Sequence, residues 1–207
     1  MSKKYILLTL LILCLASCDE GRIYNDYSIH TEEGGSADFS GEVTGTGTWS
    51  AGYTLALAGF GEGDDYAVIS KNIETEVTDE KCEVTLSGIP SNVTTIELCA
   101  LDRLRRRVAT FLCRDYNSHN GRLHMDADRL DLSMANAIQT EIFNTTCIQC
   151  HGGTEHPAAG LDLLPGKSFG NLISVSSRKM PGIDRVAPGK SSESELLMIL
   201  AADSSAG

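Results

Sequence analysis

Residues 133–152, SMANAIQTEIFNTTCIQCHG, decide how the C-terminal part of the chain folds. Met134, Ile138 and Ile142 recur at intervals of four, which puts them on one face of a helix. We therefore expect an amphipathic helix over residues 133–144, just before the Cys-x-x-Cys-His sequence of residues 147–151. The hydrophobic period changes after residue 131, so the boundary with the preceding part of the chain is expected near residues 125–132.

The pentapeptide of residues 147–151 is typical of a covalent attachment site for a c-type haem. Two thiols separated by two residues at a helix end, Cys147 and Cys150, reach the two vinyl groups of one porphyrin. The adjacent His151 then supplies an axial nitrogen to the iron. A zinc site that uses His156 would lack a second pair of ligands. A thioredoxin-type pair would need a βαβ surround, and a structural disulfide would close too small a loop to contribute much.

Further motifs follow in order: Ile142-Phe143 before the pentapeptide, Gly152 after it, and residues 160–163 (GLDL), 185–189 (RVAPG) and 194–197 (SELL). Over residues 132–200, about a third of the chain, this pattern resembles a class I cytochrome c domain and is most similar to the planctomycete-type branch. The resemblance implies an all-α cytochrome c-like domain over residues 130–207 with one haem. It also implies thioether bonds to Cys147 and Cys150, His151 as the proximal ligand, and one-electron transfer to a redox partner.

The resemblance further implies a distal methionine, commonly in Met-Pro, followed by a closing helix, and the sequence ends at Gly207 before either. We therefore expect this domain to be truncated, incomplete at its C-terminus. Met180-Pro181 matches the sequence of the distal motif but precedes Arg185, whereas the family's distal methionine follows that position. Met180 is a candidate distal ligand; without one, a five-coordinate haem would suit a sensor or a peroxidase-like enzyme.

Residues 39–125 are expected to form an all-β domain. Alternating or β-branched runs occupy residues 42–49, 53–60, 82–87, 94–101 and 108–113, with turn-forming sequences between them. Six or seven short strands at this spacing predict a small antiparallel sandwich, immunoglobulin-like in arrangement. The expected fold class is therefore mixed: a β-sandwich followed by an α-helical haem domain.

The N-terminus predicts export. Lys3 and Lys4 precede an apolar run over residues 6–15, which is shorter than the roughly 20 residues that span a bilayer. The run ends in Leu-Ala-Ser-Cys at residues 15–18, which looks like a bacterial lipobox, so Cys18 is the predicted lipidation site. Residues 1–17 are then a signal peptide and residues 18–38 a tether on the periplasmic side or the cell surface. An ordinary secretory signal is the alternative.

Charge and composition limit the partners. The 207 residues include 17 Lys and Arg against 28 Asp and Glu, a net charge of −11. Nucleic-acid binding needs a basic footprint, so we exclude it. The expected partners are a membrane, through the lipid, and a redox protein, and the chain is expected to be an electron carrier rather than an enzyme. A surface or binding lipoprotein, with the sandwich active and the haem domain degenerate, is the alternative.

Three cysteines outside the signal, the lipidation site and the motif remain: Cys82, Cys99 and Cys113. At most one disulfide can form among them, Cys99–Cys113 or Cys82–Cys99, and buried free thiols are an equal alternative. The arginines at 103 and 105–107 are expected to be solvated or paired with nearby acids, and His119 and His124 to lie at the surface.

Overall fold

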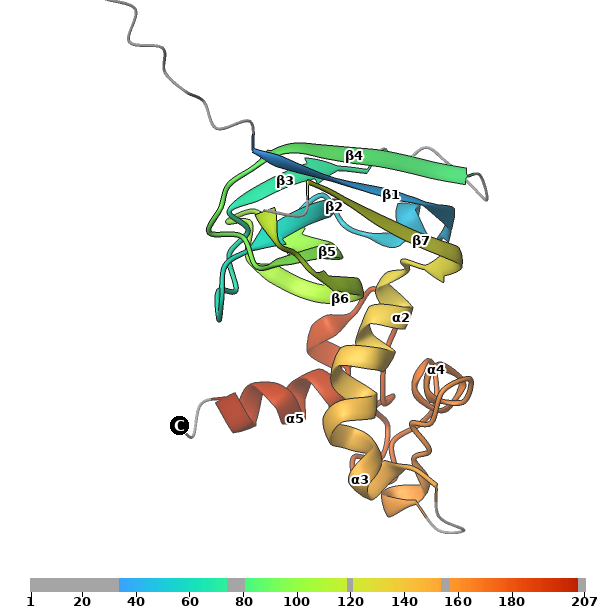
Figure 1. The fold of residues 1–207 in the computed structure, drawn as a ribbon. Coiled ribbons are helices and arrows are strands. Elements are labelled where there is room, and N and C mark those ends of the chain that lie inside the picture. The colour runs from blue at the N-terminus through green and yellow to red at the C-terminus, as the bar shows by residue number, and fades with distance from the viewer. Residues whose placement is uncertain (1–33, 74–80, 119–120, 154–156, 205–207) are drawn as a thin grey trace, which may run out of the picture. The chain divides into compact units, whose positions relative to one another are not determined.

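The first part of the fold is a sandwich of two β-sheets (Figure 1). The computed structural model describes residues 34–73, 81–118, 121–153 and 157–204. One sheet has the order β4-β1-β7 and the other the order β3-β2-β5-β6. The strands are β1 (Gly35–Thr44), β2 (Tyr53–Phe60), β3 (Ile69–Asn72), β4 (Lys81–Ile89), β5 (Thr95–Asp102), β6 (Arg107–Asp115) and β7 (Arg122–Asp131).

Hydrophobic alternation explains which strand faces lie inside. In β4, Cys82, Val84 and Leu86 are buried while the residues between them are exposed, as expected for a strand with one face on the core. Strands β2 and β5 are instead buried along almost their whole length. Their second faces belong to a separate cluster of small and apolar side chains, which includes Ala58 and Cys99.

The sandwich was predicted correctly, but its arrangement was not. Strand β1 pairs with β7 in parallel, so the sheet that contains them is mixed rather than antiparallel. An immunoglobulin-like sandwich divides its strands as first, second, fourth and fifth against third, sixth and seventh. Here the first, fourth and seventh strands share one sheet, and the expectation of an immunoglobulin-like arrangement is therefore wrong.

One long helical segment follows the sandwich directly. It consists of α2 (Met134–Ile138), a π-helical stretch η3 (Gln139–Cys147) and α3 (Ile148–His151). The Ser133 side chain caps its start by accepting a hydrogen bond of 3.1 Å from the Asn136 amide. The predicted helix start is thus observed, but the helix runs on through the whole Cys-x-x-Cys-His sequence.

The expected all-α cytochrome c-like domain over residues 130–207 is wrong. After His151 the chain forms only short helices, turns and isolated β-bridges. The helices are η4 (Ala158–Gly160), α4 (Ser168–Leu172), η5 (Ser191–Glu193) and α5 (Glu195–Ser204). Helix α5 contributes Leu196 to the small cluster around Phe143, but Leu197 and Leu200 on α5 remain exposed, as does Ile142 on η3. The described chain is therefore mainly β, with one long helix.

The start of the long helix contacts the sandwich. Trp49, which follows the turn η1 (Thr46–Thr48), donates its indole N–H to the Leu132 carbonyl over 2.6 Å. The Thr110 amide of β6 donates to the Glu141 carboxylate over 3.0 Å. Ala137 joins the core of the sandwich. These contacts fix how the helix leaves the sandwich toward residues 147–151.

Candidate functional site

The Cys-x-x-Cys-His sequence lies at the end of the long helix. Cys147 is the last residue of η3, and Cys150 and His151 complete α3 before Gly152 turns extended. Residues three and four apart share a helix face, so both thiols and the imidazole project to the same side. Cys147 and His151 are half-buried and Cys150 is exposed. The helix therefore presents all three predicted site residues together.

His151 is oriented by a backbone carbonyl. Its Nδ1 lies 3.1 Å from the Ala158 oxygen in the turn η4. Because a carbonyl only accepts hydrogen bonds, Nδ1 carries the proton and donates it, which leaves Nε2 as the basic nitrogen. A histidine held through one ring nitrogen is the usual arrangement for a metal ligand, since that bond sets the tautomer and the ring orientation.

The two thiols of the motif are free. Burial raises the pKa of the Cys147 thiol above its ordinary value, because the thiolate is poorly solvated where the side chain packs against the small core around Phe143. Cys147 is therefore a protonated thiol near neutral pH. Both motif cysteines are free of disulfide bonds, as covalent attachment to a porphyrin requires.

An apolar cavity of about 310 Å³ adjoins His151. Its walls include Leu161, Leu172, Leu196 and Ile199, and charged side chains complete its lining: Arg178, Lys179, Arg185 and Glu195. A porphyrin has apolar faces and a charged edge, and the composition of this lining suits such a group. The donor types and the orientation of His151 also fit a haem, whereas Cys147 and Cys150 do not themselves line the cavity.

Arg185 is the functional residue whose role the sequence did not reveal. Its side chain is only 6% exposed, and its guanidinium donates to the Asn171 carbonyl over 2.8 Å. The other terminal nitrogen donates to the carbonyls of Ala159 and Gly160, at 3.1 and 3.4 Å. The Ala159 and Gly160 carbonyls follow directly on the one that holds His151. Arg185 therefore braces the turn on which the imidazole depends.

The candidate distal ligand is not brought into this cavity. Met180 lies partly exposed in a turn, where its amide donates to the Ser177 hydroxyl over 2.8 Å. Its neighbour Lys179 lines the cavity beside His151, whereas Met180 is not part of that lining. Met198 borders a different cavity, near Pro188. The predicted lipidation site Cys18 and the alternative zinc ligand His156 lie outside the described residues.

The remaining cysteines are free thiols. Cys82 belongs to the core between the sheets, and Cys99 to the cluster on the other face of its sheet, so these two are on different faces. Cys113 is exposed, opposite Glu97 on the neighbouring strand. Burial raises the pKa of the Cys99 thiol far above its ordinary value. Of the alternatives that the sequence left open for Cys82, Cys99 and Cys113, the free-thiol state is the one present here.

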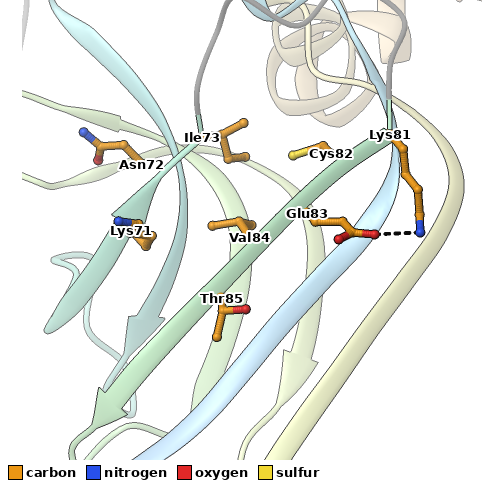
Figure 2. A pocket seen from close by; sticks show the side chains of 8 residues that line it. All are labelled: Lys71, Asn72, Ile73, Lys81, Cys82, Glu83, Val84 and Thr85. Atoms are coloured by element: carbon orange, nitrogen blue, oxygen red, sulfur yellow. Dashed lines mark ion pairs between the residues drawn. The ribbon is translucent and has the colours of Figure 1, made fainter.

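A second cavity, of about 450 Å³, lies at the edge of the sandwich between β3 and β4 (Figure 2). Figure 2 shows the Lys81–Glu83 ion pair at this edge, with an N–O distance of 2.7 Å. Both side chains of that pair are about two-thirds exposed, and burial raises the pKa of the neighbouring Cys82 thiol. Solvated charges and a protonated thiol give this cavity no evident chemistry.

Comparison with known proteins gives no relative. No protein-family model, curated protein or solved structure matches the chain. Within the described ranges, no cluster of three or more His, Cys, Asp or Glu side chains could hold a metal ion, and no described helix is long and apolar enough to cross a membrane. The cytochrome c resemblance of the sequence therefore stays a prediction.

Proposed function

We propose that this chain is an exported, lipid-anchored electron carrier with one covalent haem c. Cys147 and Cys150 form the two thioether bonds, and His151 Nε2 is the proximal ligand. The observation that carries the proposal is the hydrogen bond from His151 Nδ1 to the Ala158 carbonyl, which leaves Nε2 as the basic nitrogen on the same helix face as two free thiols.

The residues of the site have separate roles. The helix end positions the two thiols, and the turn η4 (Ala158–Gly160) orients the imidazole. Leu161, Leu172 and Leu196 exclude water from the cavity beside it. When bound, the haem iron supplies a reversible one-electron couple whose potential depends on its axial ligands and on the polarity of its surroundings.

The anchor is the second part of the proposal. The sequence of residues 15–18 supports cleavage before Cys18 and acylation of that cysteine, and residues 19–33 then connect the lipid to β1. The haem would lie on the exported side of the membrane, where c-type attachment and a membrane-bound redox partner are both available.

The test is production of the full chain in cells that mature c-type cytochromes. We expect a pyridine-haemochrome band, a haem mass added to the peptide that contains Cys147 and Cys150, and a reversible one-electron titration. C147A/C150A should lose the covalent haem, while C113A, which removes an exposed cysteine elsewhere, should keep it. Absence of haem from the parent chain, in cells that load a co-expressed cytochrome c, would overturn the proposal.

One observation favours a second candidate function, a haem that binds a small ligand at its sixth position. No methionine contributes to the described lining of the cavity beside His151. A five-coordinate ferrous haem would bind carbon monoxide, with a large shift of the Soret band. A low-spin six-coordinate spectrum that carbon monoxide leaves unchanged would exclude this function and leave electron transfer.

A further inference from the structure

The turn between β5 and β6 has a preorganised backbone. One Asp102 carboxylate oxygen accepts hydrogen bonds from the amides of Leu104 and Arg106, both at 2.8 Å. The Arg105 amide donates to the Asp102 carbonyl over 3.0 Å, and Arg105 has a φ of 65°, which is unfavourable for a side chain other than glycine. The turn is thus held in one conformation despite local strain.

This conformation exposes cationic and apolar side chains together. Arg103, Arg105 and Arg106 are exposed, and Leu104 is 74% exposed, the highest value among the exposed large apolar residues. Tyr66, 52% exposed, forms a β-bridge with Arg106. We call these five residues the arginine turn.

Three acidic groups near the turn, those of Asp65, Glu97 and Asp102, are engaged with other partners. Arg107 forms ion pairs with Glu97, at 2.7 Å, and with Asp65, at 3.2 Å. The Asp102 carboxylate accepts from the turn's own amides. Among the residues that the structure describes, none forms an ion pair with Arg103, Arg105 or Arg106. In a chain of net charge −11, this is a local cluster of unneutralised positive charge.

The composition of the arginine turn fits a lipid headgroup layer. Guanidinium groups bind phosphate through paired hydrogen bonds. Tyrosine is enriched at the level of the headgroups, and an exposed leucine gains from entering the acyl boundary.

We propose that the arginine turn docks on a membrane surface that contains anionic phospholipid. The inference rests on the proposed lipid anchor at Cys18. The 15 residues from Asp19 to Glu33 extend at most about 50 Å, so the anchored protein meets the membrane at a high effective concentration. A contact that is weak in solution then suffices to orient the sandwich on the bilayer. It should weaken with salt, because the charges are exposed.

Tryptophan fluorescence of the full-chain L104W variant tests the proposal. The emission of the parent chain, whose single tryptophan is Trp49, is subtracted from that of the variant. Both are measured with vesicles of phosphatidylglycerol and with vesicles of phosphatidylcholine. We expect a blue shift and quenching by brominated lipid in the phosphatidylglycerol vesicles only. R103Q/R105Q/R106Q in the L104W background should lower the apparent lipid affinity by roughly 100-fold. The matched control K71Q/K81Q/R114Q removes three exposed cations elsewhere on the sandwich and should keep most of the quenching.

The fluorescence of the L104W variant reports on the arginine turn and not on the lipid anchor at Cys18. A chain that lacks the acyl groups, as shown by the mass of its Cys18 peptide, should still give quenching at higher lipid concentration. Equal quenching in both vesicle types would overturn the role of the arginines. No quenching in either type, with a shift of the Leu104→Trp emission on adding poly-glutamate, would assign the turn to an acidic protein partner and overturn membrane docking.

Discussion

At the scale of single residues, Arg185 is the side chain on which the site depends most. Its buried guanidinium bonds three backbone carbonyls from two separate segments. R185Q would leave carbonyls unpaired in a buried position, and we expect it to lower the free energy of unfolding by roughly 2–4 kcal/mol. R185K should recover little, because one ammonium cannot reproduce the fork of the guanidinium.

Urea unfolding followed by far-UV circular dichroism measures this effect. R114Q is the matched control, since Arg114 is exposed and its guanidinium donates to the adjacent Cys113 carbonyl. Its free energy of unfolding should stay within about 0.5 kcal/mol of that of the parent. An R185Q variant as stable as R114Q would contradict the bracing role.

Asp38 gives a pH-dependent prediction. Burial alone would raise the pKa of Asp38, but hydrogen bonds from Arg122 and His124, the latter at 2.8 Å, bring it below its ordinary value. A carboxyl group whose pKa is lower in the folded than in the unfolded state stabilises the folded protein at every pH above its unfolded pKa, which is about 3.9 for Asp. That contribution is lost as the pH falls through the folded-state pKa. D38N should therefore cost about 1 kcal/mol at pH 7 and almost nothing at the acid end.

Trp49 fluorescence in urea at several pH values reports this difference, because Trp49 packs against the sandwich core. D128N changes an exposed acid on β7, the strand that pairs with β1 and carries Arg122 and His124, and should show no such pH dependence. A D38N deficit that stays constant down to the acid end would show that charge is not its cause.

At the scale of elements, the Ser133 cap sets where the long helix begins. S133A leaves the Asn136 amide without its side-chain acceptor and should destabilise by about 1 kcal/mol. T140A on the same helix removes a hydroxyl that donates back to the Asn136 and Ala137 carbonyls of the preceding turn, and it should be neutral or slightly stabilising. Thermal unfolding of the two variants compares them, and equal melting temperatures would count against the cap.

Short-range sequence patterns predicted the strands and the helix start that are determined by neighbouring residues in the sequence. The alternation of β4, the apolar run of β2 and the Ser133 cap were readable, and so was the grouping of Cys147 with His151. Strand β7 was missed although Leu123, Met125 and Ala127 alternate with polar residues, because the run is rich in charged side chains and only Met125 of its ten residues is fully buried. The π-helical register of η3, the parallel β1–β7 pairing and the contacts of Arg185 depend on the tertiary fold, and no short-range pattern encodes them.

At the scale of the whole molecule, the sandwich and the segment after it, which contains the proposed haem site, differ in how they are stabilised. The sandwich has one continuous core that reaches from Ala37 to Leu132 and includes Ala137. The segment after it buries only Phe143, Leu163 and Leu172 in its own cluster. So small a core seldom stabilises a fold without a further cross-link or ligand, and a covalent haem would supply that missing contribution.

Limited proteolysis of C147A/C150A against the haem-loaded parent tests this division. Without haem, cleavage should concentrate between residues 139 and 200, while a fragment that contains the sandwich survives. C113A, loaded with haem, should resist cleavage like the parent. Because the sandwich core involves neither Cys147 nor Cys150, its survival is expected in every variant. Equal resistance of residues 139–200 with and without haem would mean that the segment is stabilised by its polar network around Arg185 rather than by the cofactor.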